Sequence, residues 1–324
     1  MDAARRAPKG YRIMKTPTIE LATPEDIDRI IALRQTCMPH VQTTRSLVEW
    51  QFFKNPLGTA NVYVVRSDTG LASMIATLPR AIRVNGEVRK GRTMVDIMTD
   101  PAYRGKGLAH QHGFRCWQDM TDAGELAYIL PNPNSEKSFR RAGWTELMRV
   151  PLRSASVVEP ARKPFRHSYQ NVESFDVRAT YIWNRCSFTV GVHRDADYLN
   201  WRYSKPDCTY HRFLIDNDQG LLVLKFYSEG DKRLVHICEL HVADAQPSLV
   251  EDALRFGHDF AVHSGADTLT CWLSNGHKDE SVYAAFGFQI EHLERFIFFK
   301  SAIEPDKSLK TIPWHFSQGD SDIY

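Results

Sequence analysis

The chain has 324 residues, 43% of them hydrophobic and 25% charged, which excludes a disordered chain and favours about two domains of roughly 150 residues each. With 41 basic and 39 acidic residues the net charge is +2, so no strong overall field favours a nucleic acid or an anionic membrane. The six cysteines form no CxxC pair, which argues against a disulfide scaffold and a cysteine zinc site. Segment 1–19 has no apolar core and no stretch approaches ~20 apolar residues, so we expect a cytoplasmic protein without a membrane span.

The first half of the chain predicts one α+β unit. A helix is expected to begin at Thr23-Pro24-Glu25-Asp26, where a threonine N-cap precedes a proline and two acidic residues. An Asp68-Thr69-Gly70 turn and an Asn85-Gly86 hairpin turn then separate three strands. The elements expected after the first helix are strands over 61–66, after residue 70 and over 93–99, a helix from 108 to a glycine cap at 124, a strand over 126–130 and a helix over 135–142.

The second half repeats this order of elements. Tyr283 and Gly287 stand 144 residues after Phe139 and Gly143, and Trp201 stands 151 residues after Trp50. An ordered series of this kind predicts a tandem duplication of one α+β domain. We expect the joint in the segment over 151–164, which is rich in Ser, Pro and Arg, and therefore domains over 1–155 and 156–324.

The turn at Arg104-Gly105-Lys106-Gly107 carries the clearest chemical signal. A strand ends before it and a helix begins at Leu108. Backbone amides at such a helix N-terminus hold phosphate oxygens, and the glycines let the backbone approach a ligand closely. The turn lacks the GK[ST] of a Walker A loop and the glycine pattern of a dinucleotide site. It predicts a phosphate-binding turn, and a solvated basic turn is the alternative.

Two motifs give the first half a family resemblance. Arg104, Gly107 and Ala109 occupy the three defined places of the Q/R-x-x-G-x-G/A loop of the GNAT superfamily of acyl-CoA-dependent N-acyltransferases. Asn132, Ser135, Phe139 and Gly143-Trp144 match a second GNAT signature along the fifth strand and the next helix. The sequence therefore resembles a GNAT protein over roughly residues 20–150, and its layout is similar to tandem GNAT enzymes that acylate sugar nucleotides.

The resemblance implies a fold and a donor site. The fold is α+β, with tandem duplicated GNAT domains, each a mixed, mostly antiparallel sheet flanked by helices. Acetyl-CoA or another short acyl-CoA is the implied co-substrate. The residues implied to bind it are Met98, Thr99, Arg104, Gly105, Lys106, Gly107, Leu108, Ala109, Asn132 and Phe139.

The second copy departs from the phosphate-loop pattern. Asp244 stands where phosphate is expected, and no paired glycines accompany it. A carboxylate there repels a phosphate. We therefore expect a degenerate second copy that binds no CoA and shapes the acceptor site.

The acid–base residues remain open at this point. GNAT members often carry a tyrosine acid where this chain has Phe139, which has no proton to donate. Asp96, on the strand before the loop, is one candidate for the base, with a structural role as its alternative. Glu239 and His241 are two others, because they share one face of a strand in the second copy. No HExxH or similar spacing exists, so we expect no metal.

The acceptor is expected to be a small-molecule amine, and an amino sugar or a nucleotide-linked amino sugar is the first hypothesis. Asn134 and Arg202 are assigned to it, Arg202 for an anionic part. Another small amine, or a non-catalytic CoA-binding module, is the alternative. The tail from Trp314 to Asp322 is expected to be frayed, with an acidic latch near the acceptor as the alternative. Short basic clusters such as Arg140-Arg141 do not support a nucleic-acid partner, and the oligomeric state is left open.

Overall fold

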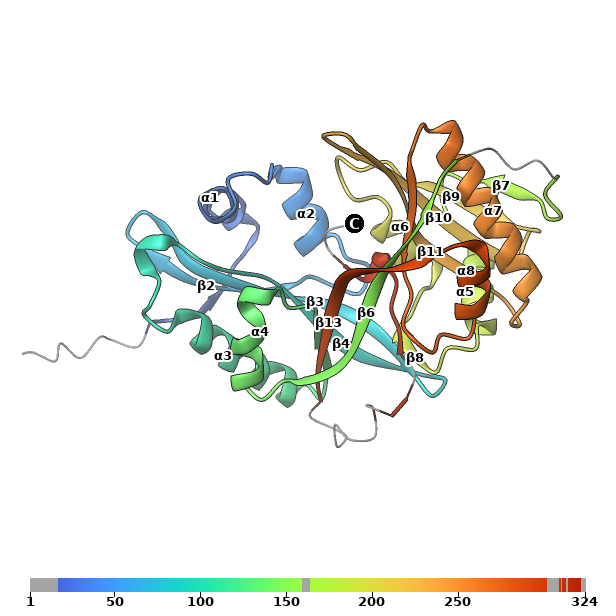
Figure 1. Ribbon diagram of the computed structural model, residues 1–324. Helices are drawn as coiled ribbons and strands as arrows, with labels where there is room; N and C mark the ends of the chain where they lie inside the picture. Colours follow the sequence, from blue (N-terminus) through green and yellow to red (C-terminus); the bar gives the residue numbers. More distant parts are fainter. Residues whose placement is uncertain (1–16, 159–163, 302–308, 310, 313, 322–324) are drawn as a thin grey trace, which may run out of the picture.

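The computed structural model describes residues 17–158, 164–301, 309, 311–312 and 314–321 (Figure 1). Its strands are β1 (Glu20–Leu21), β2 (Asn61–Ser67), β3 (Gly70–Val84), β4 (Glu87–Thr99), β5 (Leu126–Ile129), β6 (Thr145–Ser156), β7 (Tyr169–Asn171), β8 (Val190–Val192), β9 (His211–Ile215), β10 (Gly220–Glu229), β11 (Lys232–Val242), β12 (Thr268–Trp272), β13 (Gln289–Ser301) and β14 (Trp314–His315). Its α-helices are α1 (Ile27–Cys37), α2 (Arg45–Phe53), α3 (Leu108–Asp122), α4 (Pro133–Arg141), α5 (Val177–Arg185), α6 (Ala196–Arg202), α7 (Pro247–His263) and α8 (Glu280–Phe286). The described residues also form three short 3-10 helices, η1 (Pro24–Asp26), η2 (Pro101–Tyr103) and η3 (Gln318–Asp320).

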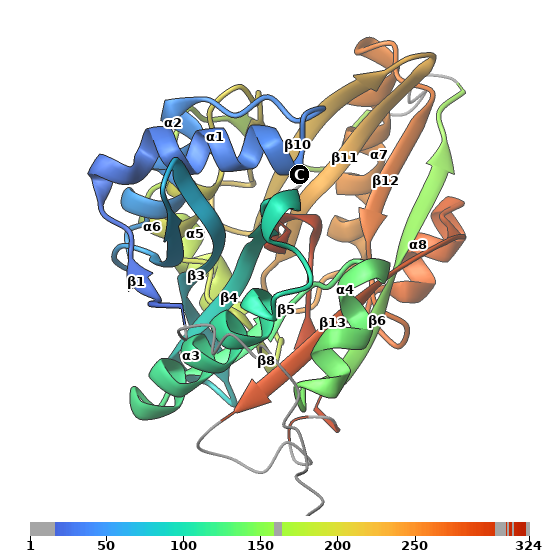
Figure 2. The same ribbon diagram turned by 90° about the vertical axis from the view of Figure 1, so that its left-hand side faces the viewer.

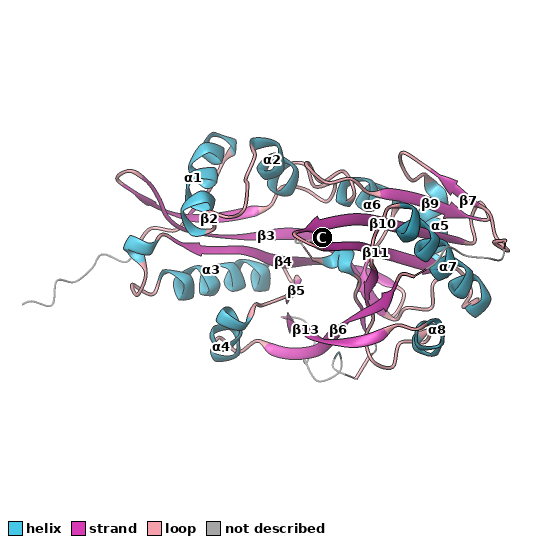
Figure 3. Ribbon diagram, turned by 45° about the horizontal axis from the view of Figure 1, so that its top comes forward, coloured by secondary structure: helices cyan, strands magenta, loops and turns pink. Residues whose placement is uncertain are grey.

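The described strands join in one continuous, mostly antiparallel sheet that runs through both halves of the chain. Its order is β1-β2-β3-β4-β5-β13-β6-β12-β11-β10-β9-β7, and β14 is attached through β8 to β3. Helices α1 and α2 cover one face of the N-terminal part, and α3 and α4 cover the other (Figure 3). The expected α+β class, with a mixed sheet flanked by helices, is confirmed. No helix in the described part of the chain combines the length and the apolar character needed to cross a bilayer.

The two halves exchange their last strands. Strand β13, from the second half, pairs with β5 of the first, and β6, from the first half, pairs with β12 of the second. Both exchanged strands also pair with each other, and they lie side by side in the centre of the molecule (Figures 1 and 2). Read from its two ends, the sheet has the order β2-β3-β4-β5-β13 on one side and β9-β10-β11-β12-β6 on the other.

The tryptophans that correspond in the two halves meet each other. The rings of Trp50 and Trp201 stack with centroids 5.0 Å apart and an interplanar angle of 15°. Trp50 Nε1 donates to the Trp201 carbonyl (2.7 Å), and Trp201 Nε1 donates to the Trp50 carbonyl (3.0 Å). Both tryptophans are buried, and the pair packs α2 of the first half against α6 of the second.

Two sequence expectations need correction. The segment beginning at residue 151 was expected to be a joint, but residues 151–156 belong to strand β6, and residues 159–163 of that segment lie outside the described part. The tail was expected to be frayed, but residues 314–321 are buried between the halves. Strand β14 pairs with β8, and Trp314 stacks on Phe316 with ring planes 4° apart. Apolar side chains repeated within the tail therefore insert it into the core, which local polarity alone does not reveal.

Candidate active site

Strands β4 and β5 separate and leave a cavity between them. They pair only from Gly91 to Thr93 on β4, and β4 then continues to Thr99 without β5 beside it. The cavity has a volume of about 600 Å³, which is within the range of small-molecule sites. Its wall contains Cys37, Met38, Arg80, Thr93, Met94, Val95, Asp96, Ile97, Met98, Thr99, Arg104, Ile129, Leu130, Pro131, Asn132, Ser135, Asp320 and Ser321.

A β-bulge places Asp96 in the wall of this cavity. Met98 faces Met74 and Val95 faces Ala76, so Asp96 and Ile97 together oppose the single residue between them on β3. Asp96 adopts a φ of +52°, a left-handed conformation that aspartate tolerates better than most residues. Its carboxylate forms an ion pair with the buried Arg34, which also donates to Gln51 Oε1 (2.5 Å). The bulge thus turns β4 and holds one carboxylate against a fixed guanidinium.

The glycine turn opens the N-terminus of α3 to solvent. Gly105 and Gly107 have φ values of +74° and +76°, which glycine adopts without strain. A Cβ atom at Gly105 would have no neighbour within 4 Å, and one at Gly107 would meet only Gln111 Nε2 at 3.8 Å. The first amides of α3, beginning at Leu108, have no partner within the helix. Arg104 lines the cavity, and Lys106 lies over the Tyr103 ring at 4.6 Å.

The residues of the second motif lie at the other side of the cavity. Asn132 and Ser135 line it, and Asn132 Oδ1 accepts from the Ser135 amide (3.0 Å), so the asparagine orders the first turn of α4. Phe139 is buried against Trp144, with ring centroids 5.7 Å apart, and it does not line the cavity. Asn134 belongs to α4, but its side chain lies outside the described part of the structure.

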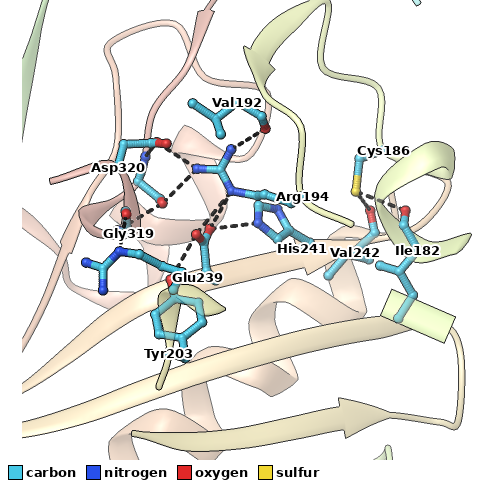
Figure 4. A network of polar contacts seen from close by, with 12 residues as sticks. Ile182, Cys186, Val192, Arg194, Tyr203, Glu239, His241, Val242, Gly319 and Asp320 are labelled. Atoms are coloured by element: carbon cyan, nitrogen blue, oxygen red, sulfur yellow. Dashed lines mark hydrogen bonds and ion pairs between the residues drawn. The ribbon is translucent and has the colours of Figure 1, made fainter. Parts of the chain in front are cut away.

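The buried tail brings a second carboxylate to the cavity. Asp320 Oδ2 accepts from Arg194 Nη2 (2.6 Å) and from the Ser317 amide (2.8 Å), while its Oδ1 has no partner among the described residues (Figure 4). Burial raises the pKa of Asp320 above its ordinary value, although Arg194 opposes this. Sequence reasoning did not name Asp320 as a site residue. The acidic end of the tail was the signal in the sequence, but only the burial of the tail places Asp320 in the wall of the cavity.

Glu239 and His241 lie behind this carboxylate. Arg194 Nε donates to both oxygens of Glu239 (3.1 and 3.0 Å), and Glu239 Oε2 contacts His241 Nε2 at 2.7 Å (Figure 4). Both residues are buried and neither lines the cavity. Arg194 and His241 outweigh the effect of burial and hold the pKa of Glu239 below its ordinary value. Among the described residues, hydrogen bonds connect Glu239 to the cavity through Arg194 and Asp320, and they connect His241 through Glu239.

Arg202 holds the tail in place. Its Nε donates to the Gly319 carbonyl (2.7 Å) and its Nη2 to the Ser321 carbonyl (2.8 Å). It is 2% exposed and does not line the cavity. Arg202 was expected to bind the acceptor, but its guanidinium is thus already hydrogen-bonded to the tail of its own chain.

Gly319 offers a test of the tail. A Cβ atom there would collide with Glu239 Oε1 and with the Tyr203 hydroxyl. We expect Gly319→Ala to displace η3 and to lower the melting temperature, because overpacking of this kind costs about 1–3 kcal/mol of stability. Because η3 carries Asp320 of the cavity wall, we also expect the activity to fall at least about tenfold. Melting curves and rates measured beside Gly70→Ala, whose Cβ meets nothing within 4 Å, check this. An unchanged melting temperature and rate would show that the tail does not position the site.

The corresponding connection in the second half is built differently. Between β11 and α7, Asp244 and Ala245 have φ values of +55° and +49°, and Asp244 forms an ion pair with Arg185. The glycines and basic side chains of the first loop are absent from this described segment.

The comparisons with known proteins agree with this geometry. Residues 18–147 match the family model described as an acetyltransferase (GNAT) domain. These residues form a GNAT acetyltransferase domain. No curated protein matches the chain. The chain is an acyl-CoA-dependent N-acyltransferase of the GNAT type.

Solved structures share the fold over most of the chain. A conserved protein from Enterococcus faecalis V583, described as a "Probable N-Acyltransferase", has a TM-score of 0.71 at 13% identity and covers 89% of this chain and 73% of its own. A GCN5-related N-acetyltransferase from Anabaena variabilis has a TM-score of 0.68 at 14% identity, with 88% and 72% covered. Eis1 from Mycobacterium abscessus has a TM-score of 0.59 at 12% identity, with 89% and 74% covered. At these identities the likeness concerns the fold.

Proposed function

We propose that the enzyme transfers an acetyl or other short acyl group from acyl-CoA to the primary amine of a small acceptor, within the cavity between β4 and β5. The observation that carries this proposal is the cavity itself, whose wall contains both Arg104, the first residue of the glycine turn, and Asp320. The amides from Gly105 to Ala109 bind the pyrophosphate, assisted by Arg104 and Lys106. The free edge of β4 at Met98–Thr99 pairs with the pantetheine arm.

Asp320 is the base that the geometry favours in this proposal. Asp96 also lines the cavity, but its carboxylate is engaged by the buried Arg34. Asp320 has an oxygen without a partner and a raised pKa, and both features suit a group that must accept a proton. Glu239 and His241 then act as positioning residues, because Glu239 contacts Arg194, His241 contacts Glu239, and neither lines the cavity.

The reaction follows from these positions. The amine nitrogen attacks the thioester carbonyl carbon, and the new C–N bond forms while Asp320 Oδ1 takes a proton from the nitrogen. The C–S bond breaks and CoA leaves as a thiolate. The thiolate takes a proton from water, and Asp320 returns its own proton to the solvent, which restores the base. Because a thiolate is a good leaving group, the transfer does not need a dedicated side-chain acid.

The second half shapes the acceptor side of the cavity in this proposal. The exchanged strands β6 and β13, the reciprocal tryptophan pair and the matching order of elements support a tandem duplication with a degenerate second copy. An amino sugar or a nucleotide-linked amino sugar is the proposed acceptor, and a cytoplasmic location is proposed with it.

Calorimetric titration with acetyl-CoA tests the donor site and its number at once. We expect one site per chain, followed by thiol release when glucosamine or another amine is added. Binding without thiol release from any amine would contradict the proposed catalysis and favour a CoA-binding module.

The variant Asp244→Gly tests the degenerate copy. Removing this carboxylate leaves Ala245 in place and supplies no basic side chain, so we expect the stoichiometry to stay at one. The wild-type chain, titrated under the same conditions, is the control. A stoichiometry of two for the variant would show that the second connection retains a CoA site.

A further inference from the structure

Arg80 is a buried guanidinium at the wall of the proposed acceptor cavity. It belongs to β3, is 7% exposed, and lies over the rings of Tyr198 (5.8 Å) and Trp201 (5.3 Å). Its Nη1 donates to the carbonyl of the preceding Pro79 (2.9 Å). Its Nε has no partner, and no carboxylate in the described part of the chain forms an ion pair with it. The aromatic rings therefore hold the Arg80 guanidinium in place, and no ion pair with a described residue neutralises its charge.

Among the residues that the structure describes, the neighbouring charges do not compensate for it. Within the described residues, the buried group around the tail contains three guanidinium groups and two carboxylates, which gives a net charge of +1 (3 − 2). The guanidinium groups belong to Arg80, Arg194 and Arg202, and the carboxylates to Glu239 and Asp320. His241 adds no charge near neutral pH, because burial lowers its pKa. Glu239 and Asp320 both form an ion pair with Arg194.

Two phenols beside Arg80 also have unused hydrogen-bonding capacity. The hydroxyls of Tyr128 and Tyr198 are buried, and that of Tyr198 has no partner among the described residues. The Tyr128 hydroxyl interacts with Arg80. Arg80 and Asp320 both influence the pKa of each phenol, so the four groups lie close together. Burial raises the pKa of both phenols, which therefore remain protonated and can donate. Buried donors without partners are rare in proteins and costly, so the unpartnered Nε of Arg80, a residue of the cavity wall, indicates a missing acceptor of hydrogen bonds.

We propose that Arg80, which lines the cavity in front of Tyr128 and Tyr198, binds an anionic group of the acceptor, a carboxylate or a phosphate ester. The acceptor's amine then faces Asp320 from the same cavity. This inference rests on the proposed acyl transfer and deepens it, because it selects amines that carry a negative charge. A guanidinium with aromatic neighbours suits planar or tetrahedral oxyanions, and in a cavity of low dielectric this contact discriminates strongly against neutral amines.

Matched amino sugars provide the test. Glucosamine carries no anion, glucosamine 6-phosphate carries a phosphate ester and muramic acid carries a carboxylate. With acetyl-CoA as donor, we expect kcat/KM to be at least about tenfold higher for one of the charged sugars than for glucosamine, and the better of the two identifies the oxyanion. Equal kcat/KM values for all three would overturn the inference while leaving the proposed function intact.

The variant Arg80→Met assigns the selectivity to this side chain. We expect it to raise KM for the preferred charged sugar at least about tenfold, with KM for acetyl-CoA unchanged. Arg83→Met is the matched control, because Arg83 lies on the same strand, is 6% exposed and lies over the Trp183 ring at 4.6 Å. Arg83 donates instead to the carbonyls of residues 183, 186 and 188 and does not line the cavity. Selectivity that survives in Arg80→Met would overturn the assignment.

Direct binding keeps the inference testable without turnover. Calorimetry with glucosamine 6-phosphate and with muramic acid is compared in the wild type and in Arg80→Met, both with CoA present. Binding of either sugar that is weakened at least about tenfold by the substitution supports the subsite. Absence of binding by both sugars overturns it, whereas failure of acetyl-CoA itself to bind contradicts the proposed function.

Discussion

Gly107→Glu is expected to abolish acetyl-CoA binding, with affinity reduced at least about 100-fold. The added carboxylate would stand where the amides and basic side chains of the turn are proposed to hold the pyrophosphate. Two like charges 4 Å apart repel by about 4 kcal/mol near a protein surface, which is more than enough for this loss. Calorimetric titration with acetyl-CoA measures the effect.

The fold is expected to survive this change. A Cβ atom at Gly107 meets only Gln111 Nε2 at 3.8 Å, so no packing is disturbed. The left-handed φ of +76° costs a non-glycine residue about 1–2 kcal/mol, which predicts a small drop in melting temperature. Gly113→Glu is the matched control, since it adds the same charge to the same helix about 9 Å further along its axis, where no atom lies within 4 Å. Full affinity in Gly107→Glu would refute the placement of the pyrophosphate at this turn.

Asp320→Asn is expected to lower kcat by about 10²–10⁴-fold, the usual contribution of a general base, with little change in KM for acyl-CoA. The amide keeps the shape of the side chain and can still accept from Arg194 and from the Ser317 amide, but it cannot take a proton. In the wild type, kcat is expected to fall as the pH decreases through the raised pKa of Asp320, because the protonated carboxyl is no longer a base. This acid limb is expected to disappear in the variant.

Asp96→Asn separates the two carboxylates of the cavity. Asp96 also lines the wall and also pairs with a buried arginine, and asparagine tolerates its left-handed conformation. We expect this variant to keep the acid limb and to lose less activity than Asp320→Asn. Acetyl-CoA titrations and melting curves on both variants separate a lost base from a lost fold. If Asp96→Asn removes the acid limb and Asp320→Asn keeps it, the base is Asp96.

Much of the local structure follows from the sequence because the signals are themselves local. Thr23 and Pro24 begin η1 and the helix after it, Asn85-Gly86 forms the expected hairpin turn, and the glycine turn precedes α3 at Leu108. Each depends on the conformational preference of a few adjacent residues, such as a positive φ or a capping side chain. The same local chemistry, read as a GNAT motif, predicted the class of enzyme.

Only the tertiary structure decided the catalytic surroundings. Glu239 and His241 do share a strand face as expected, but the tail covers that face, and Asp320 stands between it and the cavity. Arg202 was expected to bind the acceptor, but its guanidinium donates to carbonyls of the tail. The guanidinium that lines the cavity belongs to Arg80, on a strand of the first half. The strand exchange and the buried tail join residues more than 100 positions apart, and no local preference encodes such contacts. Hydrophobic burial of β13 and of the tail's aromatics decides them, and that is a property of the assembled chain.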